Sequence, residues 1–203
     1  MFKMTIHEHY ILKMMKSRTE RKNKSVLQDK AISRDIRNYG GSILQSAEFQ
    51  NAFSETHHLR GSVADHTLTV CIIAARICRT MQKRGITVNE KDLIQAALCH
   101  DLGMIGRDTV YKNRTDSWKS HPKKSASVAR DLVPDLSTNA ESMINTHMWP
   151  VSGPHPRSRE AAILNIADKW ASAADWIYFL TGKQVGADIR EELFPQKSRQ
   201  RRV

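Results

Sequence analysis

The strongest structural signal in the sequence is a run of apolar residues between positions 63 and 81, spaced three or four apart. This spacing is typical of an amphipathic α-helix that packs its apolar face inward, and Gly85 is expected to end it. His66 falls within the apolar stripe, so its imidazole should point toward the core. Burying a polar group without a partner costs about 1–3 kcal/mol, so His66 requires one.

Similar patterns predict further helices. Asn89 is expected to cap a helix that ends near His100, with Gly103 just past its end, and Ser137 or Thr138 to begin another. His121-Pro122 looks like a cap and a first helical residue, and the pair Gly40-Gly41 should separate helices over residues 29–39 and 42–53. The last long helix, residues 158–180, should turn Ile166, Trp170 and Ile177 inward. Because no stretch alternates as a strand does, the predicted fold class is all-α.

Five residues have side chains that commonly bind metals, and each lies on a different predicted helix. Each is on or next to the inward face of its helix, or at the end of it. They are His66, His100, His121, His147 and Asp168, and Asp101 follows His100 directly. One buried histidine is usually a satisfied core residue, but five on five helices have a common explanation if they converge on a metal. Imidazole and carboxylate ligands without thiolate suit Fe, Mn, Co, Ni or Zn better than Ca.

The net charge of +11 is concentrated at the ends of the chain. Residues 1–37 carry ten Lys or Arg against four acids, whereas residues 38–182 carry sixteen against fourteen. The basic termini could bind nucleic acid, but no aromatic residues alternate with them as in a single-strand binder, so solvated tails are favoured. We divide the chain into a basic, helical N-terminal extension (1–41), a central domain (42–185), and a C-terminal helix end with a basic tail (186–203).

The sequence shows no apolar run long enough for a membrane span and no signal-peptide core. Its three cysteines have no paired-ligand spacing, so we interpret them as reduced, buried thiols of a cytoplasmic protein. The sequence does not indicate an oligomeric state.

The order of the ligand residues resembles that of the HD-domain metal-dependent phosphohydrolases, over about residues 55–180. The motifs are His66 in Val-Ala-Asp-His, the pair His100-Asp101, and Asp168 in Ile-Ala-Asp-Lys. His121 and His147 resemble the two extra histidines of the binuclear subgroup. After His147 the sequence Met-Trp-Pro departs from the HD-GYP signature, so cyclic-dinucleotide hydrolysis of that kind is not expected.

The resemblance implies an HD-domain helical bundle that holds one or two divalent transition-metal ions. One ion would be bound by His66, His100, Asp101 and Asp168, and a second by His121 and His147, with Asp101 bridging. A hydroxide between the ions would then attack a phosphate ester of a small, nucleotide-like substrate. In this scheme Asp101 and His100 are catalytic as well as metal ligands.

Other residues near these motifs could hold the substrate. Lys169, next to Asp168, could meet a phosphate oxygen as a further catalytic residue, and Trp149 could stack on a base. His58, preceded by His57, precedes His66 by eight residues and could lie at the pocket mouth. Cationic candidates lie on loops or at helix starts, and we select Arg60 among them as a substrate-binding residue. The others are Arg107, Lys112, Arg114, Lys123 and Lys124.

Two alternatives remain open at this stage. The same ligand set occurs in di-iron HD-type oxygenases, whose chemistry depends on metal and redox state. Alternatively, the chain is a polyanion-binding module with a structural metal site, in which case binding would depend steeply on salt and survive His100→Ala.

Overall fold

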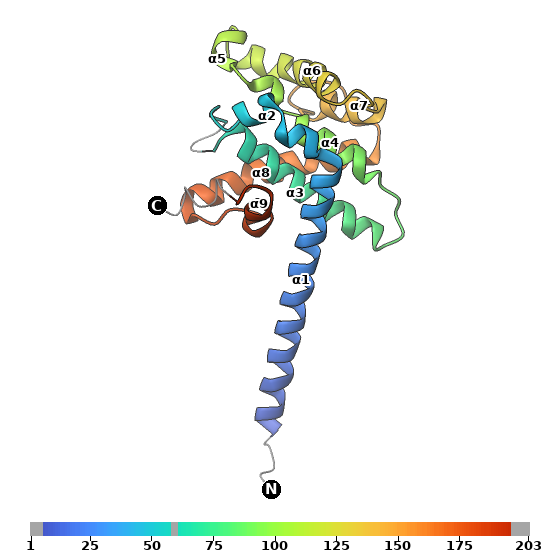
Figure 1. Ribbon diagram of the computed structural model, residues 1–203, viewed down its shortest axis with the longest axis vertical. Coiled ribbons are helices and arrows are strands. Elements are labelled where there is room, and N and C mark those ends of the chain that lie inside the picture. Colours follow the sequence, from blue (N-terminus) through green and yellow to red (C-terminus); the bar gives the residue numbers. More distant parts are fainter. Residues whose placement is uncertain (1–5, 58–60, 196–203) are drawn as a thin grey trace.

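The computed structural model describes residues 6–57 and 61–195, and this part of the chain is all-α (Figure 1), as the sequence predicts. Its elements are α1 (Ile6–Gln45), α2 (Ala47–Asn51), α3 (Val63–Gln82), α4 (Glu90–Cys99), η1 (Leu102–Met104, a 3₁₀ turn), α5 (Arg107–Val110), α6 (Arg114–Leu132), α7 (Thr138–Thr146), α8 (Arg159–Thr181) and α9 (Ala187–Leu193). Among these residues the single β-type pairing is an isolated bridge between Thr56 and Ser62.

The centre of the molecule is formed by α3, α4, α7 and α8. Helix α3 packs against both α4 and α8, and α7 packs against the same two helices. The side chains between them, such as Leu68, Leu93 and Ile144, are fully buried. Asn89 and Ser137 accept hydrogen bonds at the starts of α4 and α7, which confirms both predicted caps. The three cysteines are free and buried, as predicted.

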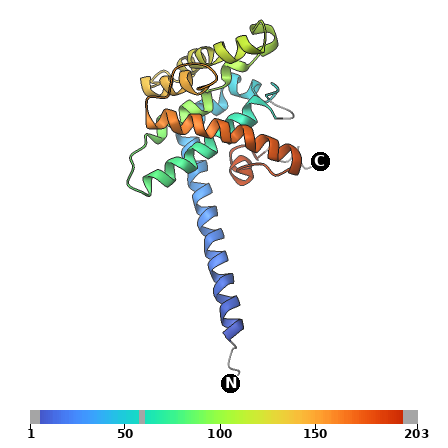
Figure 2. The same cartoon turned by 180° about the vertical axis from the view of Figure 1, so that it is seen from behind.

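Helix α1 projects far beyond the other helices (Figures 1 and 2). Near its C-terminal end Ile32 and Ile36 are fully buried, whereas Leu27 is 68% exposed. The prediction that Gly40-Gly41 ends a helix is wrong, because α1 runs through both residues. A Cβ on Gly40 would overlap Cδ1 of Leu98 in α4. Gly40 therefore permits the close contact of α1 with α4 rather than terminating a helix.

The start of α6 also differs from the prediction. The helix begins at Arg114, where the side chain of Asn113 caps it by accepting from the backbone N–H of Asp116. Pro122 therefore lies inside the helix, where it cannot donate to the carbonyl of Trp118. That carbonyl instead accepts a 2.8 Å hydrogen bond from Oγ of Ser152. This tertiary bond satisfies the group that the proline leaves open.

The solvent-exposed face of α8 carries several large apolar side chains. The prediction placed Ile166, Trp170 and Ile177 inward, but they are 50%, 68% and 57% exposed, so it is wrong for these three. The buried face carries Ile163 and Leu164 near the start of the helix, and Ala167, Asp168 and Ala171 further along it. In the described part of the chain, no helix combines the length and the apolar character needed to cross a membrane.

Candidate metal centre

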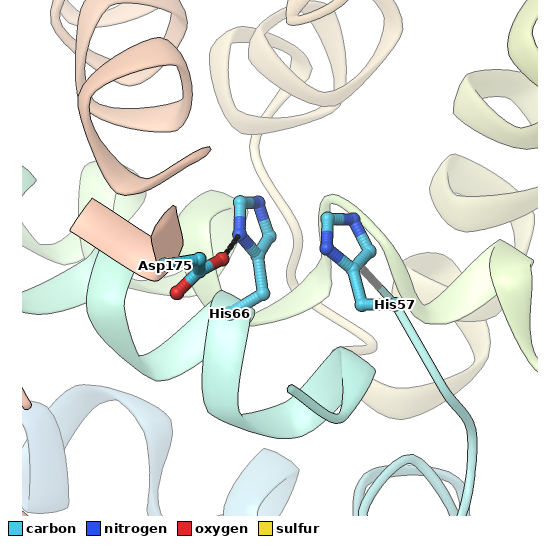
Figure 3. Close-up of side chains that lie close together, drawn as sticks. All are labelled: His57, His66 and Asp175. Carbon is cyan, nitrogen blue, oxygen red and sulfur yellow. Dashed lines mark hydrogen bonds and ion pairs between the residues drawn. The ribbon is translucent and has the colours of Figure 1, made fainter. Parts of the chain in front are cut away.

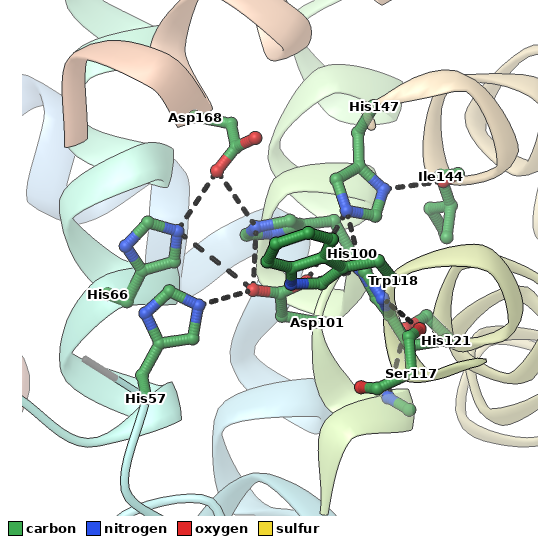
Figure 4. Close-up of polar contacts among 12 residues, drawn as sticks. His57, His66, His100, Asp101, Ser117, Trp118, His121, Ile144, His147 and Asp168 are labelled. Carbon is green, nitrogen blue, oxygen red and sulfur yellow. Dashed lines mark hydrogen bonds and ion pairs between the residues drawn. The ribbon is translucent and has the colours of Figure 1, made fainter. Parts of the chain in front are cut away.

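The six predicted metal ligands come together at one buried cluster (Figure 4). They come from different elements, as the helical phases predict. His66 lies on α3, His100 and Asp101 follow α4, His121 lies on α6, His147 follows α7, and Asp168 lies on α8. None of the six is more than 8% exposed.

The segment after Asp101 is held tightly against α6. The backbone N–H of Gly103 donates to Oγ of Ser125 at 2.9 Å. A Cβ on Gly103 would come within 2.6 Å of the His121 carbonyl oxygen and of the Ser125 nitrogen. A larger residue would therefore push the His100-Asp101 pair away from His121. Gly103 lies within η1, not just past the end of α4, and its role is close packing.

Each of the four predicted histidine ligands has an acceptor at Nδ1. His100 contacts the Ala97 carbonyl at 2.9 Å, His121 that of Ser117 at 2.8 Å, and His147 that of Ile144 at 2.7 Å. His66 Nδ1 lies 2.8 Å from Oδ2 of Asp175. In His100, His121 and His147 these contacts favour the proton on Nδ1, which leaves the Nε2 lone pairs directed into the cluster. Nε2 of His66 is directed into the cluster as well. Metal-binding histidines are commonly oriented in this way.

Asp101 lies between two groups of imidazoles. Its Oδ1 is 3.2 Å from Nε2 of His121 and 3.4 Å from Nε2 of His147. Its Oδ2 is 3.5 Å from Nε2 of His100 and 3.9 Å from Nε2 of His66. Asp168 joins the second group, with Oδ1 3.1 Å from Nε2 of His66. Each oxygen of Asp101 therefore faces its own set of ligand atoms.

The donor atoms fit a cation better than they fit one another. Nε2 of His121 and Nε2 of His147 lie 3.0 Å apart, although both rings have their Nδ1 at a carbonyl oxygen. Two lone pairs at that distance repel, so either a proton or a metal ion must lie between the two atoms. Without a metal, burial opposes the charged imidazole of His121, but Asp101 outweighs it and raises the pKa of His121, which favours the proton. Within the described part of the chain, His100 Nε2 and Asp101 Oδ1 are buried without a hydrogen-bond partner. Buried polar groups are normally satisfied, so these two point to a ligand.

Three triads in and around this cluster could hold a metal ion. Two of them share Asp101: His66, His100 and Asp101, and Asp101, His121 and His147. The third consists of His57, His66 and Asp175. Within each triad the ligand atoms lie within 4.8 Å of one another. Ligands of one ion, at about 2.0–2.2 Å from it, would have such separations.

The electrostatics of the cluster without metal favour a positive charge at His66. Burial opposes the charged imidazole, but hydrogen bonds to Asp168 and Asp175 outweigh it and raise the pKa of His66 from 6.5 to about 10. Burial lowers the pKa of His100 to about 4, so this ring is neutral. Burial opposes the charged carboxylate of Asp101, yet His100, His121, His147 and His57 together hold its pKa well below the usual range. The carboxylates thus stay ionised, as metal ligands must.

Two residues near the cluster were not predicted as metal-site residues, and His57 was considered only beside His58, as a histidine that could lie at the pocket mouth. Asp175 accepts at Nδ1 of His66, and the ring of His57 stacks on that of His66 with 3.9 Å between centroids (Figure 3). His57 also places Nε2 3.1 Å from Oδ2 of Asp101. A signal for Asp175 existed, since it follows Asp168 by seven residues and so shares its helical face. His57 lies in a loop, where no periodicity selects it over His58.

The remaining predicted residues differ in their placement. Lys169 lies at the cluster, with Nζ 3.0 Å from Oδ2 of Asp168 and 2.5 Å from the His147 carbonyl oxygen. Trp149 is 38% exposed and packs edge-on against His155. His58 and Arg60 lie outside the described residues.

A cleft of about 420 Å³ opens onto the cluster. Asp101, His121, His147, Asp168 and Lys169 form its polar wall. Its remaining lining includes Trp118, Met104, Met148 and Val151, so Trp118 is the aromatic residue of this cleft in place of Trp149. A volume of this size suits a small-molecule site.

The fold and the cluster define an all-α protein with a buried His/Asp site that could bind metal. The HD domain family matches residues 63–173, more than half of the chain, and the protein therefore belongs to that family. This places it in a superfamily of generally metal-dependent hydrolases. A conserved hypothetical protein from Pyrococcus furiosus is similar in structure, with a TM-score of 0.45 and 16% identity over 87% of this chain and 99% of that chain. No significant match to a curated protein is found.

Proposed function

We propose that this protein is a phosphohydrolase that acts on small phosphate esters at a two-ion centre. The observation that carries the proposal is the position of Asp101, whose two oxygens face two separate sets of histidine Nε2 atoms. One ion would be held by His66, His100, Asp101 and Asp168, and the other by Asp101, His121 and His147. The site needs no serine or cysteine nucleophile.

Bound transition-metal ions would supply Lewis acidity and a water of lowered pKa. The chain itself contributes fixed geometry, because all four ligand histidines are held at Nδ1 by acceptors in the protein. Rings oriented before the metal binds need no rearrangement when it arrives.

Lys169 is placed to contact the phosphoryl group. Its ammonium has two partners, the Asp168 carboxylate and the His147 carbonyl, which leaves a third N–H for a phosphoryl oxygen. Its side chain is 39% exposed and lines the cleft. Trp118 and the neighbouring apolar side chains offer a surface for the organic part of a substrate, which supports a nucleotide-like ester.

The test begins with purified protein loaded separately with Mn, Fe, Co, Ni or Zn, followed by a panel of phosphomonoesters and phosphodiesters. We expect phosphate release with at least one ion and a loss on the order of 100-fold or more in Asp101→Ala. Asp131→Ala is the matched control, because its side chain is exposed and lines neither cleft of the site. Undiminished phosphate release by Asp101→Ala would overturn the proposal. Oxygen consumption by the iron-loaded protein, without phosphate release, would favour the oxygenase alternative instead.

A further inference from the structure

A second cleft, of about 530 Å³, adjoins the metal centre. His57, Arg107 and Arg114 line it, and the same three residues also line the first cleft. The two clefts therefore share a wall. The second cleft lies next to the cleft that opens onto the cluster, so one ligand with two anionic groups could contact both.

The second cleft carries an excess of positive charge. Its lining contains three cations, Arg107, Lys112 and Arg114, and one carboxylate, Asp108. The Asp108 carboxylate lies 3.7 Å from Nε of Arg107, but its side chain is 96% exposed. Because water screens an exposed ion pair, Asp108 offsets little of the positive charge of the cleft. The guanidinium of Arg114 lies 4.8 Å from the centre of the Trp118 ring, which links the cationic wall to the first cleft.

The cationic wall is attached directly to the metal-binding segment. The hydroxyl of Tyr111 donates a 2.7 Å hydrogen bond to the carbonyl of Gly103, two residues after Asp101. The residue that follows Tyr111 is Lys112, whose backbone N–H is fixed by Asp116 at 3.0 Å. These bonds hold the backbone of the wall at a set distance from the cluster.

We propose that Arg107, Lys112 and Arg114 form a second anion subsite, so that the substrate carries a second phosphate group besides the one that is hydrolysed. This inference rests on the proposed function and narrows its substrate class to bisphosphorylated small molecules, such as nucleoside bisphosphates. Arginine suits the subsite because its planar guanidinium pairs with two phosphate oxygens at once. A monophosphate bound at the cluster would have no second phosphate to pair with the cations of the second cleft, which would stay hydrated.

The kinetic test compares adenosine 5′-monophosphate with adenosine 3′,5′-bisphosphate on the metal-loaded protein. We expect kcat/KM to be roughly tenfold higher for the bisphosphate, and the preference to shrink as salt rises. In the double variant Arg107→Gln/Lys112→Gln this preference should fall toward unity. The control Lys119→Gln/Arg157→Gln removes the same charge at exposed positions and should keep it.

A binding test separates this inference from the proposed function. The bisphosphate and the monophosphate are titrated into metal-free protein by calorimetry, with expected tighter binding of the bisphosphate that the double variant abolishes. That result without any phosphate release would support the subsite and overturn the phosphohydrolase. Equal rates and equal binding of the two nucleotides, unchanged in the double variant, would overturn the subsite and leave the phosphohydrolase standing.

Discussion

The two sides of the buried His/Asp cluster are built differently. On one side His66 is held at Nδ1 by a carboxylate, Asp175, and faces a second carboxylate, Asp168. On the other side His121 and His147 are held at Nδ1 by backbone carbonyls and share the one carboxylate of Asp101. More negative charge therefore surrounds the His66 side, and we infer that an ion binds there more tightly than at the His121 and His147 side. Asp101 is the element common to both.

Removing the shared carboxylate should have the largest effect. We expect Asp101→Ala to lose both ions, because each site loses an oxygen ligand, and phosphate release should fall with them. Metal analysis after equilibrium dialysis measures the stoichiometry, with the exposed Asp131→Ala as the control. Asp101→Asn keeps the side-chain shape and should show the same loss. Two ions per chain in both Asp101 variants would contradict its bridging role.

Removing one histidine of the second site should cost one ion. We expect His147→Ala to retain about one ion per chain at the His66 side, because that site keeps all of its ligands. His155→Ala, which changes an exposed histidine, serves as the comparison. If His147→Ala lost both ions together, the two sides would not be separate sites.

Weakening the support of His66 should have a smaller and one-sided effect. Asp175→Asn removes the carboxylate that holds Nδ1, so the affinity for the first ion should fall by about 10–100-fold. The affinity for the second ion should change little, since its histidines are held by backbone carbonyls. Titrating each variant against a chromophoric chelator gives both constants, and an equal drop in the two would refute the asymmetry.

The last prediction changes no residue and concerns the pH dependence of metal binding. Without metal, His66 binds a proton with a pKa of about 10. An ion must displace that proton, so first-site affinity should rise with pH up to about pH 10, by roughly tenfold per unit, with about one proton released per ion. Calorimetry in buffers of different ionisation enthalpy counts the released protons. A first-ion heat that is independent of the buffer would show that His66 is unprotonated.

Much of the cluster could be predicted because its ligands lie on or at the ends of regular helices. For His66, His100 and His147, the helical spacing alone predicts a side chain that faces the core, and all three are buried in the structure. His57 could not be predicted in this way. His57 lies outside any helix, and its position depends on tertiary contacts such as the hydrogen bond that its backbone N–H donates to the Gly61 carbonyl.

The errors in the fold arise where tertiary contacts overrule local signals. Gly40 and Pro122 both suggest helix boundaries, yet each lies inside a helix. Gly40 is required by the approach of Leu98, and the carbonyl that Pro122 leaves open is bonded by Ser152. Likewise, Trp170 and Ile177 fit an inward stripe by spacing, but the buried face of α8 is the one that carries Asp168 and Asp175 toward His66.

We propose that the Asp101 carboxylate is shared by two ion sites of unequal affinity. The most direct test of this proposal is a metal titration of the wild-type protein by equilibrium dialysis, with the bound metal measured at each free concentration. We predict two ions per chain at saturation, with the first bound more tightly than the second. A plateau at one ion per chain or below would contradict this description of the site.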